Sequence, residues 1–333
     1  KNIYITGVAG FLGSHLADRF LDLGFNVSGN DNMLGGFKSN VSKSVNFHET
    51  DCCDFEEMTK NIQGSDIVIH TAATAHEGLS VFSPHFVTRN IFDASTSVIT
   101  ASIKNNVEKF ILCSSMARYG EQELPFKETQ TPMPVDPYGI AKVASENILK
   151  NLGNLHGMNW NIAVPHNIVG PRQRYDDPFR NVMSIMINRN LQGKPAIIYG
   201  DGLQKRCFSY IDDCLYCLEK LSLDDNISNE IVNIGPDEGT ITINKLSELV
   251  ANETGFNGDP IYHKDRPQEV KYAMCSADKA RLLLNYETKI DIECSIKQTV
   301  KWIKERGTLE FDYSYPLEII NEKTPDTWKK KLI

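Results

Sequence analysis

The stretch NIYITGVAGFLG (2–13) decides the fold that we expect for this chain. Its first five residues predict a strand, after which Gly7, Gly10 and Gly13 come before a helical pattern. The first glycine allows a tight turn, the second lets the backbone approach a pyrophosphate, and the third lets helix and strand pack closely. A strand, a glycine loop and a helix in this order predict a dinucleotide site.

The helix and strand that follow strengthen this prediction. FLGSHLADRFLDLG (11–24) places apolar side chains at helical spacing, and FNVSGND (25–31) reads as a second strand that ends at Asp31. A carboxylate 18 residues after Gly13 can accept hydrogen bonds from both hydroxyls of a ribose and would repel a 2′-phosphate. Because Lys38 is the nearest cation after it, we expect NAD rather than NADP.

The first half of the chain alternates between strand and helix patterns, which is typical of a parallel sheet with helices on both faces. We therefore expect an α/β fold, a Rossmann-type doubly wound parallel sheet, in residues 1–165. Further strands are predicted at 45–49, 66–73, 109–113 and 158–164, and helices at about 54–62, at 84–105 and up to residue 157.

After residue 165 the pattern loosens, and we expect a smaller α/β substrate-binding domain, mainly 166–307. The chain is expected to return to the first domain near 206–235. An extension, 308–333, is expected to pack on the body or on a partner subunit. The predicted elements are a helix at 180–192, a short strand pair around 196–210, a helix from Asp212, and amphipathic helices at 243–255 and 295–307.

The composition excludes several classes of protein. The chain has 333 residues with 43 acidic against 35 basic ones, a net charge of −8 that argues against nucleic acid as a partner. We find no apolar run of about 18 residues and expect no membrane span; the first residues also lack a signal pattern. Eight cysteines are scattered, and the pair Cys214–Cys217 lacks a second pair nearby. We therefore expect free thiols in a cytoplasmic protein and no metal site.

A second motif carries the chemistry. DPYGIAK (136–142) places Tyr138 and Lys142 four residues apart, on one face of a helix. A free tyrosine has a pKa of about 10, which a nearby ammonium and an oxidised nicotinamide both lower. Tyr138 can then act as a base near neutral pH. Ser115, in CSSMARYG (113–120) at the end of a predicted strand, can hydrogen-bond to the same reacting oxygen.

Together these motifs resemble the extended short-chain dehydrogenase/reductases, specifically their nucleotide-sugar epimerase/dehydratase group with its UDP-glucose 4-epimerase-like members. The resemblance spans about 1–305, through GVAGFLG, DNM (31–33), HTAA (70–73), Asn90, SSMARYG, YGIAK, HNIVGPRQ (166–173), GDGLQKRCFSYIDD (200–213) and RPQE (266–269). It implies that Ser115, Tyr138 and Lys142 are catalytic and that NAD is the cofactor. The residues expected to bind NAD are Gly7, Gly10, Phe11, Leu12, Gly13, Asp31, Asn32, Asp51, Cys52, Thr71, Ala72, Ala73, Asn90, Tyr138, Lys142 and Pro165.

The resemblance also implies a nucleotide-diphosphate sugar as substrate, and two arginines suit its phosphates. Three positions depart from the family pattern: His166, which we expect near the nicotinamide, and Cys207 and Glu269, each in place of an aspartate. The position that limits pocket size falls at Ala273, which leaves room for an N-acetyl group or a uronic acid. The residues expected to bind the substrate are Ser115, Met116, Asn167, Asn181, Tyr199, Arg206 and Arg266.

The two residues after Ser115 select the reaction. Dehydratases, decarboxylases and 3,5-epimerases of the family carry an acid or a cysteine there, whereas Met116 and Ala117 cannot transfer protons. We therefore expect 4-epimerisation of a UDP-hexose or of its N-acetyl or uronic derivative. Two alternatives stay open. One is another NAD-linked reaction, such as CDP-sugar 2-epimerisation or GDP- or UDP-sugar dehydrogenation or dehydration. The other is a non-catalytic NAD-binding regulator.

A few other side chains carry predictions. Asp136 is expected to cap the helix of the second motif, and Asp212–Asp213 to cap another helix rather than to catalyse. His70 is expected to be a satisfied core histidine. Arg118 is either a surface charge or a contact to the sugar. The family resemblance implies a homodimer built from the helices near 84–105 and 138–153.

Overall fold

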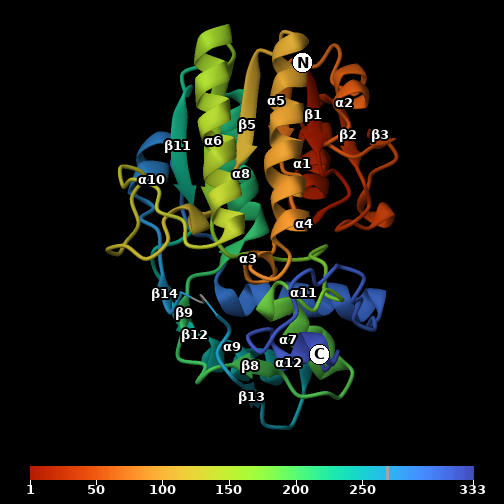
Figure 1. The fold of residues 1–333 in the computed structure, drawn as a ribbon, viewed down its shortest axis with the longest axis vertical. Helices are drawn as coiled ribbons and strands as arrows, with labels where there is room; N and C mark the ends of the chain where they lie inside the picture. The colour runs from red at the N-terminus through yellow and green to blue at the C-terminus, as the bar shows by residue number, and fades with distance from the viewer. Residues whose placement is uncertain (268–269) are drawn as a thin grey trace.

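The computed structural model describes residues 1–267 and 270–333. Figure 1 shows a large sheet flanked by long helices and, below it, a smaller group of short strands and helices that holds the C-terminus. All neighbouring strands of the seven-stranded sheet run parallel. In spatial order they are β11 (Glu230–Ile234), β6 (Asn159–Pro165), β5 (Lys109–Cys113), β4 (Ile67–His70), β1 (Asn2–Thr6), β2 (Asn26–Asp31) and β3 (Asn46–Glu49).

This strand order is that of a doubly wound sheet, so the predicted fold class is confirmed. The chain moves outward from β1 to β3, crosses back to β4, and then moves outward on the other side to β11. The winding therefore reverses between β1 and β4, and ligands of such sheets bind in the crevice at the carboxyl ends of these strands. The topology alone thus places a site beside the glycine loop.

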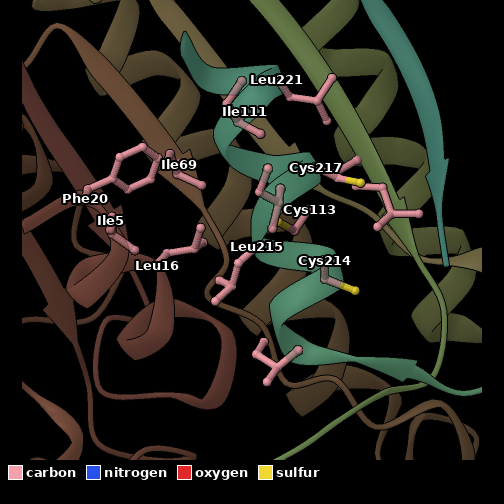
Figure 2. Close-up of a cluster of buried hydrophobic side chains, with 14 of the residues drawn as sticks. Ile5, Leu16, Phe20, Ile69, Ile111, Cys113, Cys214, Leu215, Cys217 and Leu221 are labelled. Carbon is pink, nitrogen blue, oxygen red and sulfur yellow. The ribbon is translucent and has the colours of Figure 1, made fainter. Parts of the chain in front are cut away.

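Helices cover both faces of the sheet. Figure 2 shows Leu215 and Cys217 of one helix in a single apolar cluster with Ile111 of the sheet and with Leu16 and Phe20 of another helix. On this face lie α1 (Phe11–Asp22), α8 (Ile211–Leu223) and α10 (Asp278–Leu284). On the other face α2 (Phe55–Asn61), α5 (Ala94–Lys104) and α6 (Pro137–His156) lie side by side. Short turns are η1 (Lys38–Asn40), α3 (Glu77–Ser80) and η3 (Met116–Arg118).

Local signals set the ends of α6. Asp136 accepts a hydrogen bond from the backbone of Gly139 at 2.8 Å, and Pro137 occupies the first turn, so the structure shows the predicted cap. Gly157 ends the helix in the left-handed conformation with a φ of 74°. The first turn of α6, which holds Tyr138, therefore lies at the carboxyl edge of the sheet.

Two local predictions are confirmed in outline and refined in detail. The stretch predicted as helical at 84–105 is helical through Lys104, and a π-helical turn, η2 (Arg89–Asp93), lies between α4 (Pro84–Thr88) and α5. The acidic pair predicted at the start of a helix lies in the first turn of α8, where acidic side chains suit the helix dipole, although Tyr210 is the N-cap residue. Asp213 of this pair accepts from the backbone N–H of Lys289 at 3.1 Å and thus holds a distant loop.

The smaller part consists of short strands whose partners lie far apart in the sequence. The strand pair predicted around 196–210 is wrong, because this stretch forms three strands that do not pair with one another in the described part of the chain. The observed pairs are β8 (Ile197–Tyr199) with β13 (Ile261–His263), β10 (Ser209–Tyr210) with β7 (Ile168–Val169), and β9 (Lys205–Arg206) with β12 (Ile241–Thr242) and β14 (Tyr272–Ala273).

Two apolar clusters hold this part together. The first lies between the helices α7 (Val182–Leu191), α9 (Ile243–Thr254) and α11 (Ile292–Arg306), and includes one residue from each of them, Met186, Leu246 and Val300. In the second, Tyr315 and Trp328 of the extension pack on the body of the protein. The extension includes α12 (Asp326–Lys329). The chain returns to the large sheet through α8 and β11.

The cysteines are free thiols, and Cys214 and Cys217 lie buried in α8 within the cluster of Figure 2. Among residues 1–267 and 270–333, no group of three or more metal-binding side chains comes together. Nor does any helix in that part of the chain have the length and apolar composition of a membrane span.

Candidate active site

A first cavity of about 310 Å³ lies at the carboxyl ends of the central strands, where the winding of the sheet reverses. Its volume is within the range of ligand-binding pockets. All the residues predicted to bind the cofactor line it. They are Gly7, Gly10, Phe11, Leu12, Gly13, Asp31, Asn32, Asp51, Cys52, Thr71, Ala72, Ala73, Asn90, Tyr138, Lys142 and Pro165.

Glycine is required in this loop because backbone packs closely on backbone. A Cβ on Gly7 would lie 2.9 Å from the Cα of Ala72, and the φ of +69° at Gly7 disfavours other residues. A Cβ on Gly13 would collide with the backbone of Gly7. This packing leaves the N-terminus of α1 in the cavity wall, where a helix N-terminus can bind phosphate oxygens.

Asp31 ends β2 in the wall of this cavity. Its carboxylate accepts hydrogen bonds from the backbone N–H groups of Ala9 at 3.1 Å and Met33 at 2.8 Å. Burial raises the pKa of Asp31, and these backbone donors oppose the rise. The carboxylate is thus fixed where it can accept from ribose hydroxyls, so together with the glycine loop the residues of the cavity fit NAD.

His70 has both ring nitrogens engaged. They lie 2.7 Å from the hydroxyl of Thr6 and 3.1 Å from that of Ser95. Burial lowers the pKa of His70 to about 3, so the ring stays neutral. This is the satisfied core histidine that we predicted, and it braces β4 against β1 and α5.

Ser115, Tyr138 and Lys142 line the first cavity together. The ammonium of Lys142 donates to the carbonyl oxygen of Cys113 at 2.8 Å and lies 5.9 Å from the centre of the Tyr138 ring. Lys142 thereby links α6 to the end of β5, the strand that leads into Ser115. The structure brings the three predicted catalytic residues to one place.

The ionisation of this group depends on what binds beside it. Burial raises the pKa of Tyr138 to about 12, against the effect of the nearby Ser115 hydroxyl. Burial also lowers the pKa of Lys142 to about 8. Both side chains are therefore shifted toward their neutral forms. A cationic ring bound next to Tyr138 would favour the phenolate and lower its pKa.

A second cavity, of about 290 Å³, meets the first. Ala75, Asn167, Arg180 and Asn181 line both. Two of these, Asn167 and Asn181, are predicted substrate residues, and they therefore lie at the junction. A ligand that spans the junction would reach Tyr138 from the second cavity.

The wall of the second cavity carries the other polar residues predicted for the substrate: Tyr199, Arg206 and Arg266. The guanidinium of Arg266 lies over the ring of Tyr199, 4.8 Å from its centre. Arg206 donates to the carbonyl oxygen of Val270 at 2.5 Å, which holds it beside β14. An aromatic ring and two guanidinium groups suit a nucleoside diphosphate.

Met116 does not follow its prediction. It begins η3, is half-buried, and packs on the apolar cluster of α2, α5 and α6. Among the described residues it lines neither cavity. Ser115 accepts from the N–H of Ala117 at 3.2 Å and so caps this turn, and Ala117 packs in an apolar cluster with Tyr138.

Other positions also differ from the expectation. His166 is buried against the carbonyl oxygen of Pro236, 3.0 Å from its Nε2, and lines neither cavity, so it does not lie near the expected nicotinamide. Cys207 is buried beside the hydroxyl of Thr240. Ala273 belongs to a hydrophobic cluster rather than to a cavity wall. Gln268 and Glu269 of the RPQE motif lie outside the described residues.

Arg118 is neither a surface charge nor a sugar contact. It is 2% exposed, and its guanidinium forms two hydrogen bonds with the carboxylate of Glu146, at 3.0 and 2.9 Å. Ser114 donates to the same carboxylate at 2.5 Å. This buried pair joins the turn that carries Ser115 to α6, the helix that carries Tyr138.

The sequence did not suggest four residues that line the cavities: His76, Glu77, Arg180 and Tyr315. His76 and Asp177 form a buried pair at 2.5 Å, although they lie 101 residues apart in the chain. No spacing within a motif indicates such a pair. Tyr315 belongs to the extension, beyond the span of the family resemblance.

Comparison with known proteins agrees with this geometry. A protein of Methanocaldococcus jannaschii, provisionally named UDP-glucose 4-epimerase, is 34% identical, over 92% of this chain and 99% of its own. The structure of Thermotoga maritima UDP-glucose 4-epimerase with UDP-glucose superimposes with a TM-score of 0.87 at 32% identity, over 92% and 99% of the two chains.

A third match adds a different sugar. Methanobrevibacter ruminantium UDP-N-acetylglucosamine 4-epimerase, in complex with UDP-N-acetylmuramic acid, has a TM-score of 0.85 at 29% identity, again over 92% of this chain and 99% of its own. The model of one family matches residues 3–235. The glycine loop, the sheet order and the residues at the junction all lie in that range. The chain belongs to the NAD dependent epimerase/dehydratase family.

Proposed function

We propose that this chain is an NAD-dependent epimerase that inverts C4 of a UDP-hexose, or of its N-acetyl or uronic derivative, through a transient 4-keto sugar. One observation carries the proposal: Ser115, Tyr138 and Lys142 meet where the glycine-loop cavity joins a cavity with two arginines and an aromatic ring. The three similar proteins described above are named as 4-epimerases of UDP-sugars.

The chain's own residues supply the proton transfers of this reaction. Bound NAD would supply the hydride acceptor and donor for C4 of the sugar, and the glycine loop and Asp31 would hold it. Tyr138 removes the proton of the C4 hydroxyl as the hydride leaves and gives it back on return. Ser115 donates a hydrogen bond to the reacting oxygen. Lys142 adds positive charge that favours the phenolate form of Tyr138.

The second cavity would hold the rest of the substrate. Arg206 and Arg266 would bond to the diphosphate, and the ring of Tyr199 would lie against the nucleoside. Asn167 and Asn181 would contact the substrate at the junction. The sugar would then lie between the two cavities, within reach of Tyr138.

Competing reactions are disfavoured by what surrounds Ser115. Met116 and Ala117 cannot transfer protons, so the turn beside the serine has no means of expelling water. Glu77 and Asp136 contribute carboxyl groups to the wall of the second cavity. The assay of the products must therefore also measure loss of water from the sugar. A regulator without catalysis is disfavoured because Tyr138 and Lys142 are both present and the similar proteins are enzymes.

Incubation with UDP-, GDP-, CDP- and dTDP-sugars, followed by NMR of the products, tests the proposal. We expect a UDP-sugar inverted at C4 without added NAD, because the cofactor is regenerated in each cycle. Loss of water or of CO₂, or stoichiometric NADH, would contradict it. Inversion at C2 of a CDP-sugar would support the alternative epimerase instead.

We also propose a cytoplasmic homodimer that pairs α5 and α6 with their counterparts in a second copy. The two helices lie side by side on one face of the sheet (Figure 1), which would let them form a four-helix interface. Sedimentation equilibrium of the wild-type protein would give the mass of a dimer. The mass of a monomer at assay concentrations would refute this part of the proposal.

A further inference from the structure

The extension 308–333 borders both cavities. Tyr315 lines the first, and Ile333 lines the second. The similar proteins match 92% of this chain and 99% of their own. The family model matches residues 3–235, so the walls that the extension provides lie outside that match.

The extension is firmly docked on the segment that enters α4. Backbone N–H groups of Glu318 and Ile319 donate to the carbonyl oxygen of Phe82 at 3.0 and 2.8 Å. In return, the carboxylate of Glu318 accepts from the N–H groups of His85 and Phe86 at 3.0 and 2.9 Å. These reciprocal bonds hold the extension in place and cap the first turn of α4.

One contact holds the loop that covers the first cavity. The hydroxyl of Tyr315 donates to the carbonyl oxygen of Leu34 at 2.7 Å. Leu34, Gly35 and Gly36 line the cavity just beyond Asp31. Arg174 donates to the same carbonyl oxygen at 3.0 Å. Tyr315 and Arg174 thus both support the loop at the carbonyl oxygen of Leu34.

A second contact holds the aromatic wall of the second cavity. The hydroxyls of Thr327 and Tyr199 lie 2.6 Å apart, and Thr327 is 1% exposed. Tyr199 in turn lies under the guanidinium of Arg266. Trp328, the next residue, comes close enough to Gly78 that a Cβ there would lie 3.5 Å from the indole. The extension therefore contacts the second cavity at two points, the ring of Tyr199 and Gly78.

We propose that Thr327 and Tyr315 are positioning residues. Thr327 orients Tyr199 for the nucleoside of the substrate, and Tyr315 holds the Leu34–Gly36 loop over the cofactor. The assignment of the two ligands rests on the proposed function. Each residue acts on one cavity through a single hydroxyl, so the two effects are separable.

Thr327→Val tests the first half of the inference, because valine keeps the shape of threonine and removes its hydroxyl. We expect the Kd for UDP, measured by calorimetry, and the KM for the sugar nucleotide to rise roughly 3- to 10-fold, with kcat little changed. The amount of copurified NAD should not change. Thr324→Val is the matched control, because the hydroxyl of Thr324 bonds only within the extension in the described contacts.

Tyr315→Phe tests the second half. We expect bound NAD to dissociate roughly 3- to 10-fold faster, while the Kd for UDP stays unchanged. Gel filtration measures the dissociation through the NAD absorbance that no longer elutes with the protein. Tyr175→Phe is the matched control. Tyr175 also donates from a buried ring to a backbone carbonyl, that of Gly307 at 2.8 Å, but it lines neither cavity among the described residues.

Binding separates this inference from the proposed function. If the wild-type protein binds neither UDP nor NAD, the proposed function fails. If it binds both, and Thr327→Val and Tyr315→Phe match their controls in binding, the inference fails. Loss of both ligands together in either variant would also overturn it, because a general loosening of the extension would then explain the result. Thermal unfolding of all four variants verifies that each is folded.

Discussion

The two cavities are built in different ways. The first lies along the ends of adjacent parallel strands, so residues that end successive strands arrive at one edge without any further arrangement. The second takes its walls from β8, β9, the segment before β14 and the extension. In the first cavity the sheet itself sets the positions of the lining residues, whereas in the second cavity those positions depend on many separate contacts.

The largest effect is expected where the cavities meet. Tyr138→Phe removes the group that takes the proton and should lower kcat on the order of 10²- to 10⁴-fold. Copurified NAD and the Kd for UDP should stay near wild-type values, because each cavity keeps its own contacts. Turnover assays with parallel binding measurements provide the check. Tyr286→Phe, a buried tyrosine outside both cavities in the described chain, should retain activity.

The next largest effect is expected on stability, from the buried Arg118–Glu146 pair that joins the Ser115 turn to α6. Arg118→Met leaves the buried carboxylate of Glu146 with the hydroxyl of Ser114 but without its charged partner, and should lower the free energy of unfolding by about 3–5 kcal/mol. Urea unfolding measures this loss. The double variant Arg118→Met/Glu146→Leu should recover much of it, because no buried charge is then left alone. Equal losses in the single and double variants would mean that the unpaired carboxylate of Glu146 is not the source of the lost stability.

A smaller effect is expected for a substitution in the second cavity, which should weaken substrate binding without changing NAD binding in the first. Arg206→Gln removes a charge proposed to bond to the diphosphate and should raise the KM for the sugar nucleotide roughly 10- to 100-fold. The content of NAD should stay unchanged. Arg19→Gln is the control, because Arg19 pairs with Glu219 outside both cavities among the described residues. A loss of NAD from Arg206→Gln would show that the cavities are not independent.

The smallest effect tests the first cavity through pH. Burial raises the pKa of Asp31 above its ordinary value of 3.8, so its ionisation destabilises the fold. In the protein without NAD, the contribution of Asp31 to the free energy of unfolding should therefore fall as pH rises from 3.8 through the raised value. Asp31→Asn should lack this fall and be the more stable protein at neutral pH.

The same substitution should weaken NAD binding about tenfold, since an amide accepts ribose hydroxyls less well than a carboxylate. Denaturant unfolding across the acidic to neutral range, together with NAD titration, gives both quantities. A variant that loses stability at neutral pH would show that the bonds to Ala9 and Met33 outweigh the cost of burying the charge.

The sequence predicted the first cavity well because its signals are local. The glycine loop, Asp31 and the Tyr138–Lys142 spacing each lie within one turn or one strand end, and the alternation of strands and helices predicts the parallel sheet that places them together. Residues 2–6 and 109–113 coincide with β1 and β5. The proposed roles of these residues stay predictions, but the structure brings all of them to one cavity.

The remaining features depend on pairings that no local pattern contains. Residues 196–210 read as a hairpin because strands near in sequence often pair, yet each short strand found a distant partner. Arg118 was expected to be either a surface charge or a contact to the sugar, and only Glu146 on a different element explains its burial. Met116 follows Ser115 directly, but adjacency in the chain did not place it in the same cavity.

The π turn at Arg89–Asp93 sets the rotation of α4 relative to α5 and holds Asn90 in the cavity wall. Such a turn contains one residue more than the α-helical ladder needs. Removing one residue there would rotate everything on one side of the turn by about 100° relative to the other side. The bond from the amide of Asn90 to the hydroxyl of Thr74, at 3.1 Å, depends on that rotation. The length of this helix, and not only its composition, therefore shapes the cavity.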